Sequence, residues 1–211
     1  MDELFRRIQH AAAPVITEGS PYLIIGLGNP GREYRETRHN VGFMAVDRLC
    51  ADLGMTIGRM QSKALVGIGA YSGHRMILAK PQTYMNLSGQ AVSGLIRFHK
   101  VPIENLLILH DDLDLPLGTI RIRANGSSAG QKGVNSIITQ LATQEFPRVR
   151  IGIGRPPGQM KGADYVLETF MGDEKITMDR LLDQVVKAVK IYITDGLDQA
   201  MNLYNGPVER D

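Results

Sequence analysis

Four polar residues suited to acid–base chemistry stand where predicted strands end. Asn29 and His39 lie in one glycine-rich stretch after the first apolar run, Asp111 follows another apolar run, and Asn86 begins a predicted helix. Ligands of α/β proteins gather at the carboxyl edge of the sheet, so we expect these residues to meet there. His39 would exchange a proton near neutral pH, Asp111 would fix its tautomer, and the asparagines would hold carbonyls or amides.

The glycine-rich stretch also permits a dinucleotide site. Gly26, Gly28 and Gly31 have the GxGxxG spacing of dinucleotide-binding turns. In that motif the third glycine lies inside a helix whose N-terminus faces the pyrophosphate. Residues 32–40 are polar and lack an apolar stripe, so the helix starts too late. A dinucleotide-binding oxidoreductase is therefore a minor alternative.

A metal site and a reactive thiol are further alternatives. Asp111, Asp112 and Asp114 are carboxylates of the kind that suits magnesium. However, adjacent residues of a strand point to opposite faces, which leaves few convergent ligands, and we expect neither a metal nor a cofactor. The single cysteine, Cys50, lies among apolar residues of a predicted helix and is expected to be a buried hydrophobe in a reducing compartment.

The order of the apolar patterns predicts an α/β fold. Strands are predicted at 22–27, 64–71, 75–79, 106–109, 119–123 and 149–153, and helices at about 40–53, from 86 to Pro102, at 134–141, 173–193 and up to 204. Such interleaving indicates a single domain, 22–211, with a mixed twisted central β-sheet covered by helices on both faces. Residues 1–21 are predicted to be an N-terminal extension and linker, with Leu4, Phe5 and Ile8 at helical spacing.

Composition narrows the location and the partner. The 211 residues contain no apolar run of membrane-span length, and the N-terminus carries charges where a signal peptide needs an apolar core, so we expect a cytoplasmic protein. The net charge is only +2, but residues 118–161 hold seven basic residues against one acid, a balance of +6 that leaves −4 for the remainder. Such polarisation favours a phosphate-binding face, with a dispersed solvated surface as the alternative.

Five motifs resemble the bacterial peptidyl-tRNA hydrolase family: GLGNPG, ETRHNVGF, MNLSG, HDDLDLPLG and RVRIGIGRP, in this order and spacing. The resemblance runs from about Tyr22 to Gly206. It implies a monomeric esterase without metal or cofactor, which cuts the ester between a peptide and the 3′ ribose of tRNA. The resemblance also assigns His39 as the base for water, Asp111 as its orienting partner, and Asn29 and Asn86 as residues that position the peptidyl group or the water.

The resemblance further implies contacts to the substrate. Tyr34 matches an aromatic residue beside the ribose and terminal base, and Tyr84 one that lines the peptide groove. Arg123 and Arg150 fall where the family clamps the 5′ phosphate of tRNA. The implied partner is therefore the acceptor stem and 3′ end of peptidyl-tRNA, held through phosphate and shape with little base readout.

One loop departs from the family pattern. Where the family commonly reads GGHNG, residues 129–133 read AGQKG, so Lys132 replaces an asparagine that holds the substrate. Lys132 either bonds a peptide carbonyl or the oxyanion, or reaches phosphate or solvent. Because some chloroplast relatives are RNA-splicing scaffolds, a non-catalytic RNA-binding scaffold is the main alternative function. The presence of all four motif residues, His39, Asp111, Asn29 and Asn86, argues against it.

Overall fold

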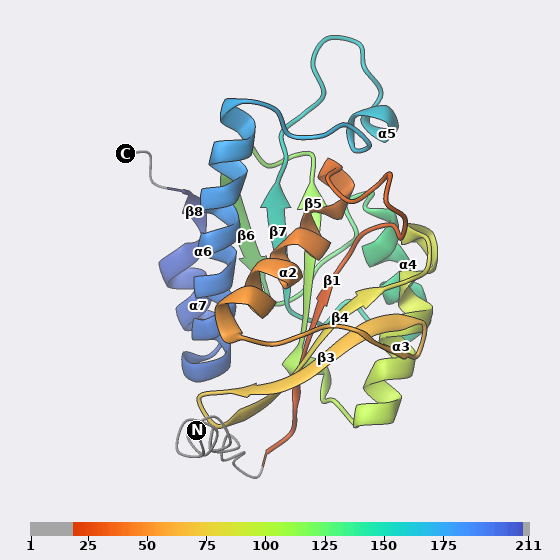
Figure 1. Ribbon diagram of the computed structural model, residues 1–211, viewed down its shortest axis with the longest axis vertical. Coiled ribbons are helices and arrows are strands. Elements are labelled where there is room, and N and C mark those ends of the chain that lie inside the picture. Colours follow the sequence, from red (N-terminus) through yellow and green to blue (C-terminus); the bar gives the residue numbers. More distant parts are fainter. Residues whose placement is uncertain (1–18, 209–211) are drawn as a thin grey trace, which may run out of the picture.

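An eight-stranded mixed sheet runs through the molecule (Figure 1), in the order β2-β3-β4-β1-β5-β7-β6-β8. The structure is a computed structural model that describes residues 19–208, so the helix predicted around Leu4 to Ile8 lies outside the described residues. The strands are β1 (Tyr22–Gly26), β2 (Arg59–Gln61), β3 (Ala64–Tyr71), β4 (His74–Pro81), β5 (Leu106–Asp112), β6 (Thr119–Arg123), β7 (Arg148–Gly152) and β8 (Gly206–Pro207).

Within residues 19–208, six α-helices connect and cover these strands. They are α2 (Val41–Leu53), α3 (Ser88–His99), α4 (Lys132–Leu141), α5 (Gly162–Tyr165), α6 (Asp173–Asp195) and α7 (Leu197–Tyr204). Three short 3-10 helices, Arg38–Asn40, Met85–Leu87 and Ile103–Asn105, precede α2, α3 and β5. The predicted α/β class with one mixed sheet is confirmed. The sequence patterns did not indicate β2, β8 or α5, because two to four residues are too few to show a hydrophobic period.

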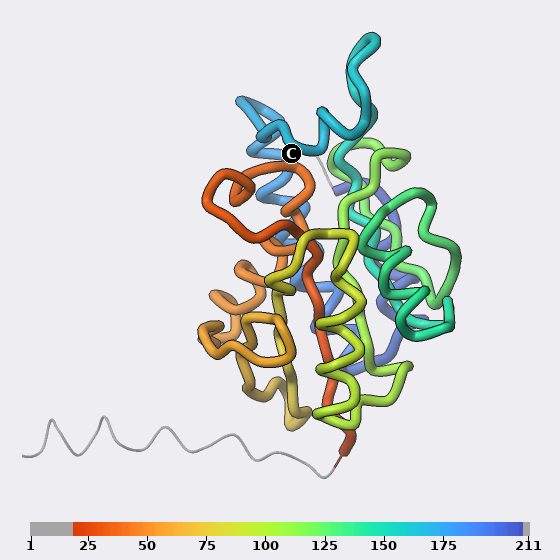
Figure 2. Tube along the Cα trace, turned by 90° about the vertical axis from the view of Figure 1, so that its right-hand side faces the viewer, coloured from red at the N-terminus to blue at the C-terminus, as the bar shows by residue number. Residues whose placement is uncertain are grey.

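The four central strands, β4, β1, β5 and β7, are parallel, while the outer pairings are antiparallel. Ile24 of β1 stands opposite Leu78 on one side and Leu107 on the other. Parallel strands end at the same edge of a sheet, so the loops after these four strands meet there. Figure 2 shows the orange loop after β1 and the cyan loop after β7 at one end of the molecule, and the start of β1 at the other.

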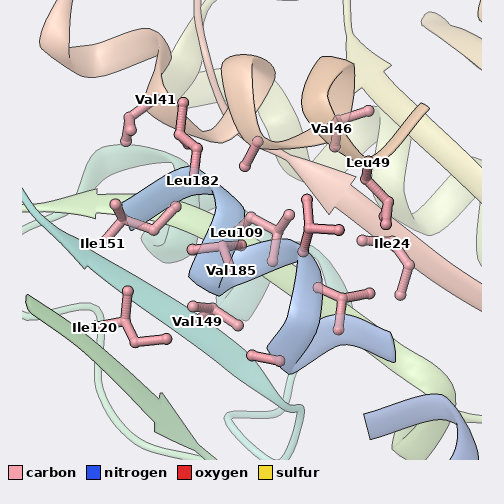
Figure 3. Packing of buried hydrophobic residues seen from close by; sticks show 14 of the residues in the cluster. Ile24, Val41, Val46, Leu49, Leu109, Ile120, Val149, Ile151, Leu182 and Val185 are labelled. Carbon is pink, nitrogen blue, oxygen red and sulfur yellow. The ribbon is translucent and has the colours of Figure 1, made fainter. Parts of the chain in front are cut away.

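The sheet is buried on both faces, which explains why its central strands are almost wholly apolar. Ile24 packs in the cluster formed with α2 and α6, whereas its neighbours Leu23 and Ile25 pack with α3 and α4. Figure 3 shows Val46 and Leu49 of α2 beside Ile24, with Leu182 and Val185 of α6 near Leu109 and Ile151. None of the helices in the described part of the chain has the length and apolar character of a membrane span.

The glycines after β1 allow the close approach of α2. A Cβ at Gly26 would lie 2.1 Å from the carbonyl oxygen of Gly42, and one at Gly28 would lie 2.8 Å from the ring of Phe43. Gly31 has φ of +121°, which favours glycine. Gly26 and Gly28 are buried under α2 and do not line a surface for a pyrophosphate, so the dinucleotide alternative loses its support.

Cys50 lies in the core on α2, as the sequence predicts. Burial raises the pKa of its thiol to about 11, with a further contribution from the carboxylate of Asp47. A thiol with such a pKa stays protonated at neutral pH, so Cys50 has no role as a nucleophile.

Candidate active site

An open cleft of about 1040 Å³ lies at the carboxyl edge of the parallel strands. Segments that follow all four of these strands line it: 29 and 39 after β1, 84–86 after β4, 111–114 at the end of β5, and 162–164 with 166 and 167 after β7. Residues 128–132, which lead into α4, close the remaining side. The sheet topology thus brings together segments that lie far apart in the sequence.

His39 and Asp111 form a pair at the floor of this cleft. The Nδ1 atom of His39 lies 2.8 Å from Oδ2 of Asp111. An ionised carboxylate only accepts hydrogen bonds, so in the neutral imidazole Nδ1 carries the proton and Nε2 has the lone pair. The side chain of Asp111 is 4% exposed and that of His39 is 13% exposed, so the pair is largely shielded while His39 borders the cleft.

Gln131 holds the second oxygen of the same carboxylate. Its Nε2 donates to Oδ1 of Asp111 at 2.9 Å. Its Oε1 accepts from the backbone N–H of Val134 at 2.8 Å, so the same amide caps the N-terminus of α4. Both oxygens of Asp111 therefore accept a hydrogen bond from a side chain.

Asn29 is fixed by two elements. Its backbone N–H donates to Oδ1 of Asn40 at 2.8 Å, and Nδ2 of Asn40 donates back to the carbonyl of Asn29 at 2.9 Å. Its own Oδ1 accepts from the backbone N–H of Met85 at 2.9 Å. The acceptor of the Asn29 amide is therefore occupied, and its Nδ2 is the group left to donate toward the cleft.

The backbone around His39 is tied to the wall that follows β7. The N–H groups of Arg38 and His39 donate to the carbonyls of Glu168 and Val166, at 2.9 and 2.8 Å. The guanidinium of Arg38 stacks over the ring of Tyr165, 4.4 Å from its centre, and donates to Glu174 at 2.6 Å. His39 is thus held by both its side chain and its main chain.

A second histidine next to Asp111 is not a candidate base. His110 is buried within β5, and its Nδ1 lies 2.8 Å from the carbonyl oxygen of Asp111. Burial lowers the pKa of His110, against the smaller effect of the neighbouring aspartates. His110 is therefore neutral and has no access to water in the cleft.

The predicted substrate residues fall into two groups. Tyr84, Asn86 and Lys132 line the cleft, and all three are exposed. Tyr34 lies in the turn before His39, where its carbonyl accepts from the hydroxyl of Thr37, and it does not belong to the cleft lining. The structure therefore brings three of the four predicted substrate residues to the cleft.

The basic segment, residues 118–161, contains arginines that are exposed and arginines that are bonded to other groups of the protein. Arg123 is exposed at the end of β6. Arg150, on β7, is partly buried, and its Nε donates to Asp112 at 2.5 Å. Arg148 is interior and donates to the carbonyls of Gly126 and Gln144, at 2.7 and 2.8 Å. Burial, with Arg150 nearby, lowers the pKa of Arg148 to about 10, so it stays charged but is not part of a surface.

The carboxylates at the end of β5 point in different directions. Asp111 bonds His39, Asp112 bonds Arg150, and Asp114 bonds the exposed Arg155 at 2.9 Å. Within residues 19–208, no three histidine, cysteine or carboxylate side chains converge as a ligand set for a metal ion would.

The sequence analysis missed two residues that shape the site. Gln131 differs from the family pattern, and its place just before the helix that begins at Lys132 is a capping position. Asn40 follows His39, and an asparagine just before a helix is suited to bond a neighbouring backbone. No sequence signal indicates that the partners of these amides are Asp111 and Asn29.

The site permits one kind of chemistry in particular. An imidazole whose Nδ1–H is held by a buried carboxylate, at the edge of an open cleft, can take a proton from water through Nε2. The fold and the site define the class of the chain as a hydrolase built on a mixed sheet covered by helices. A family model described as peptidyl-tRNA hydrolase matches residues 23–211, and the chain belongs to that family.

Individual relatives agree with this assignment. The peptidyl-tRNA hydrolase of Chloroflexus aggregans is 49% identical over 185 residues, which are 87% of this chain and 98% of that protein. That of a Thermoanaerobacter species is also 49% identical, over 88% of this chain and all of its own length. The crystal structure of the Acinetobacter baumannii peptidyl-tRNA hydrolase superimposes with a TM-score of 0.82 at 36% identity, over 93% of this chain and 99% of the other.

Proposed function

We propose that this chain hydrolyses the ester between a peptide, or an N-blocked aminoacyl group, and the 3′ ribose of tRNA. The observation that carries the proposal is the 2.8 Å contact between His39 and Asp111 at the cleft of a chain in this family. Nε2 of His39 takes a proton from water as the water oxygen attacks the ester carbonyl. The tetrahedral intermediate then collapses, the bond to the 3′ oxygen breaks, and the proton returns to that oxygen.

The remaining cleft residues would hold the peptidyl group. Nδ2 of Asn29 donates to the attacked carbonyl or to the water, since its Oδ1 is engaged by Met85. Asn86 and Lys132, which both line the cleft, bond peptide carbonyls, and Tyr84 lines the peptide groove. Tyr34, outside the cleft lining, would stack against the terminal nucleotide.

The tRNA partner would bind through phosphate. Arg123 and Arg150 are proposed to hold the 5′ phosphate of the acceptor stem, with the Asp112 carboxylate fixing the side chain of Arg150. A monomer in the cytoplasm, acting without a cofactor, completes the proposal.

The direct test is the release of free tRNA from an N-blocked aminoacyl-tRNA by the purified chain. Turnover supports the esterase. Binding of the tRNA without any turnover would instead favour the alternative of an RNA-binding scaffold.

Arg123→Ala is expected to raise KM for peptidyl-tRNA and to leave a minimal N-blocked aminoacyl ester unaffected. The plot of log kcat/KM against log salt concentration should flatten by roughly one unit of slope per lost phosphate contact. The double variant Arg123→Ala with Arg150→Ala should raise KM further and flatten the salt dependence further. Because loss of Arg150 leaves Asp112 buried without its partner, the single variant is the cleaner measurement.

Arg97→Ala is a suitable control, since Arg97 is exposed on α3 and lies outside the basic segment. It should leave KM and the salt dependence as they are in the wild type. Equal losses on peptidyl-tRNA and on the minimal ester would refute a phosphate clamp at Arg123.

Lys132→Met is expected to lower kcat/KM by about 10-fold on both peptidyl-tRNA and a minimal N-blocked ester. The substitution removes a charged donor from the cleft wall while keeping the alkyl chain, and a charge-assisted hydrogen bond is worth about this much. Lys132→Asn should retain part of the activity because its amide also donates. A loss confined to the full tRNA substrate would show that Lys132 contacts phosphate instead.

A further inference from the structure

We propose that Gln131 is a positioning residue that fixes the carboxylate of Asp111, and through it the imidazole of His39. The inference rests on the proposed role of His39 as the general base. It concerns a side chain that reaches the base only through Asp111, so its contribution can be separated from that of the base itself.

The amide of Gln131 is engaged at both ends. Oε1 accepts from the N–H of Val134, which fixes which end of the amide faces the helix. Nε2 must then face away from α4, and it lies 2.9 Å from Oδ1 of Asp111. An amide flipped the other way would put its NH₂ group against the N–H of Val134 and lose both bonds. The orientation of Gln131 is thus set by the helix, independently of Asp111.

Capping alone does not require a glutamine. Serine, threonine, aspartate and asparagine are the preferred N-cap residues, and their shorter side chains reach the N–H three residues on. The additional length of Gln131 is what lets one side chain cap α4 and still reach β5. The glycine at position 133 makes room for this path, because a Cβ there would lie 3.0 Å from Oε1 of Gln131 and 2.5 Å from Sδ of Met85.

Two donors leave the Asp111 carboxylate no freedom to rotate. Nδ1–H of His39 bonds Oδ2 and Nε2–H of Gln131 bonds Oδ1, so the carboxylate plane is held at both oxygens. With only one bond, the carboxylate can turn about its terminal torsion, which is broad, and the imidazole can follow. Gln131 therefore acts on the direction in which Nε2 of His39 points.

The test separates this role from capping. Gln131→Ser keeps an N-cap acceptor for Val134 but cannot reach Asp111, whereas Gln131→Leu loses both contacts. We expect Gln131→Ser to lower kcat by about 10-fold with KM little changed. This loss is smaller than the whole rate contribution of a general base, because His39 itself is still present. Its melting temperature should stay near that of the wild type, and Gln131→Leu should lower both kcat and the melting temperature. Gln199→Ser, on the exposed face of α7, controls for a glutamine-to-serine change in a helix.

A double-variant cycle gives a second readout. If Gln131 acts through Asp111, Gln131→Ser should have no further effect on kcat once Asp111 is alanine. A wild-type kcat in Gln131→Ser, or equal fold losses in the presence and absence of Asp111, would overturn the inference. The inference would also be overturned if kcat in the Gln131 variants decreased only in proportion to the melting temperature. Turnover that does not depend on His39 would instead overturn the proposed function, so the two failures are distinguishable.

Discussion

Replacing His39 with alanine is expected to lower kcat for peptidyl-tRNA by roughly 10³-fold, within the range that a positioned general base contributes. The variant keeps the cleft but has no group at the position of Nε2 to take a proton from water. Binding of tRNA should persist, because the proposed phosphate contacts at Arg123 and Arg150 lie outside the cleft lining. Single-turnover release of tRNA, with a separate binding measurement, checks both statements.

The chain offers a matched histidine control for this change. His74 begins β4, at the amino edge of the central strands, and its ring packs against Tyr22. His74→Ala should therefore keep the wild-type kcat, at most with a lower melting temperature. A His39→Ala variant that turns over within a few-fold of the wild type would exclude His39 as the base. Among residues 19–208, no other histidine lines the cleft.

The sequence predicted the parts of the site that follow from the order of the elements. β1 and the first four residues of β5 are continuous apolar runs, and the polar residues that follow, Asn29 after β1 and Asp111 at the end of β5, mark the carboxyl edge. Since the topology of parallel strands is restricted, an edge shared by several strands follows from the pattern. The α/β fold and the position of the cleft at this edge could therefore be predicted from the order of the strands.

The parts that the sequence did not predict depend on which side chains meet across elements. The sequence places Arg150 in the basic segment and, by resemblance, at the 5′ phosphate, but does not show that alternation along β5 directs Asp112 away from Asp111 and toward Arg150. Arg148 was counted with the same surface and instead binds loop carbonyls in the interior. These contacts depend on strand register and on the path of the loop that leads into α4, which no local pattern in the sequence specifies.

The two neighbouring aspartates thereby separate two tasks within one strand. Asp111 faces the imidazole and the capping amide, and Asp112 faces the guanidinium of Arg150. Because successive side chains of β5 point to opposite faces of the sheet, Asp111 can support the proposed chemistry on one face and Asp112 the proposed phosphate contact on the other.

Asp111→Asn is expected to lower kcat by roughly 10²-fold or more, because the amide cannot satisfy both of its neighbours. His39 and Gln131 each donate to one oxygen of Asp111, and asparagine has only one oxygen. Gln131 cannot turn, since its own oxygen caps α4. The carbonyl of the asparagine therefore faces Gln131, and its NH₂ group faces Nδ1 of His39, which must then accept. The proton moves to Nε2, and the imidazole is in the wrong tautomer to act as a base.

This account predicts an unusual double variant. In Asp111→Asn with Gln131→Ser, the donor at Oδ1 is gone, and the asparagine can turn its carbonyl toward His39 and restore the Nδ1–H tautomer. The double variant should therefore be several-fold more active than Asp111→Asn alone, although Gln131→Ser by itself lowers kcat. A double variant no faster than Asp111→Asn would show that the lost charge of Asp111, rather than the tautomer of His39, limits the rate. Measurements of kcat on one N-blocked aminoacyl-tRNA for the four proteins of this cycle decide between the two explanations.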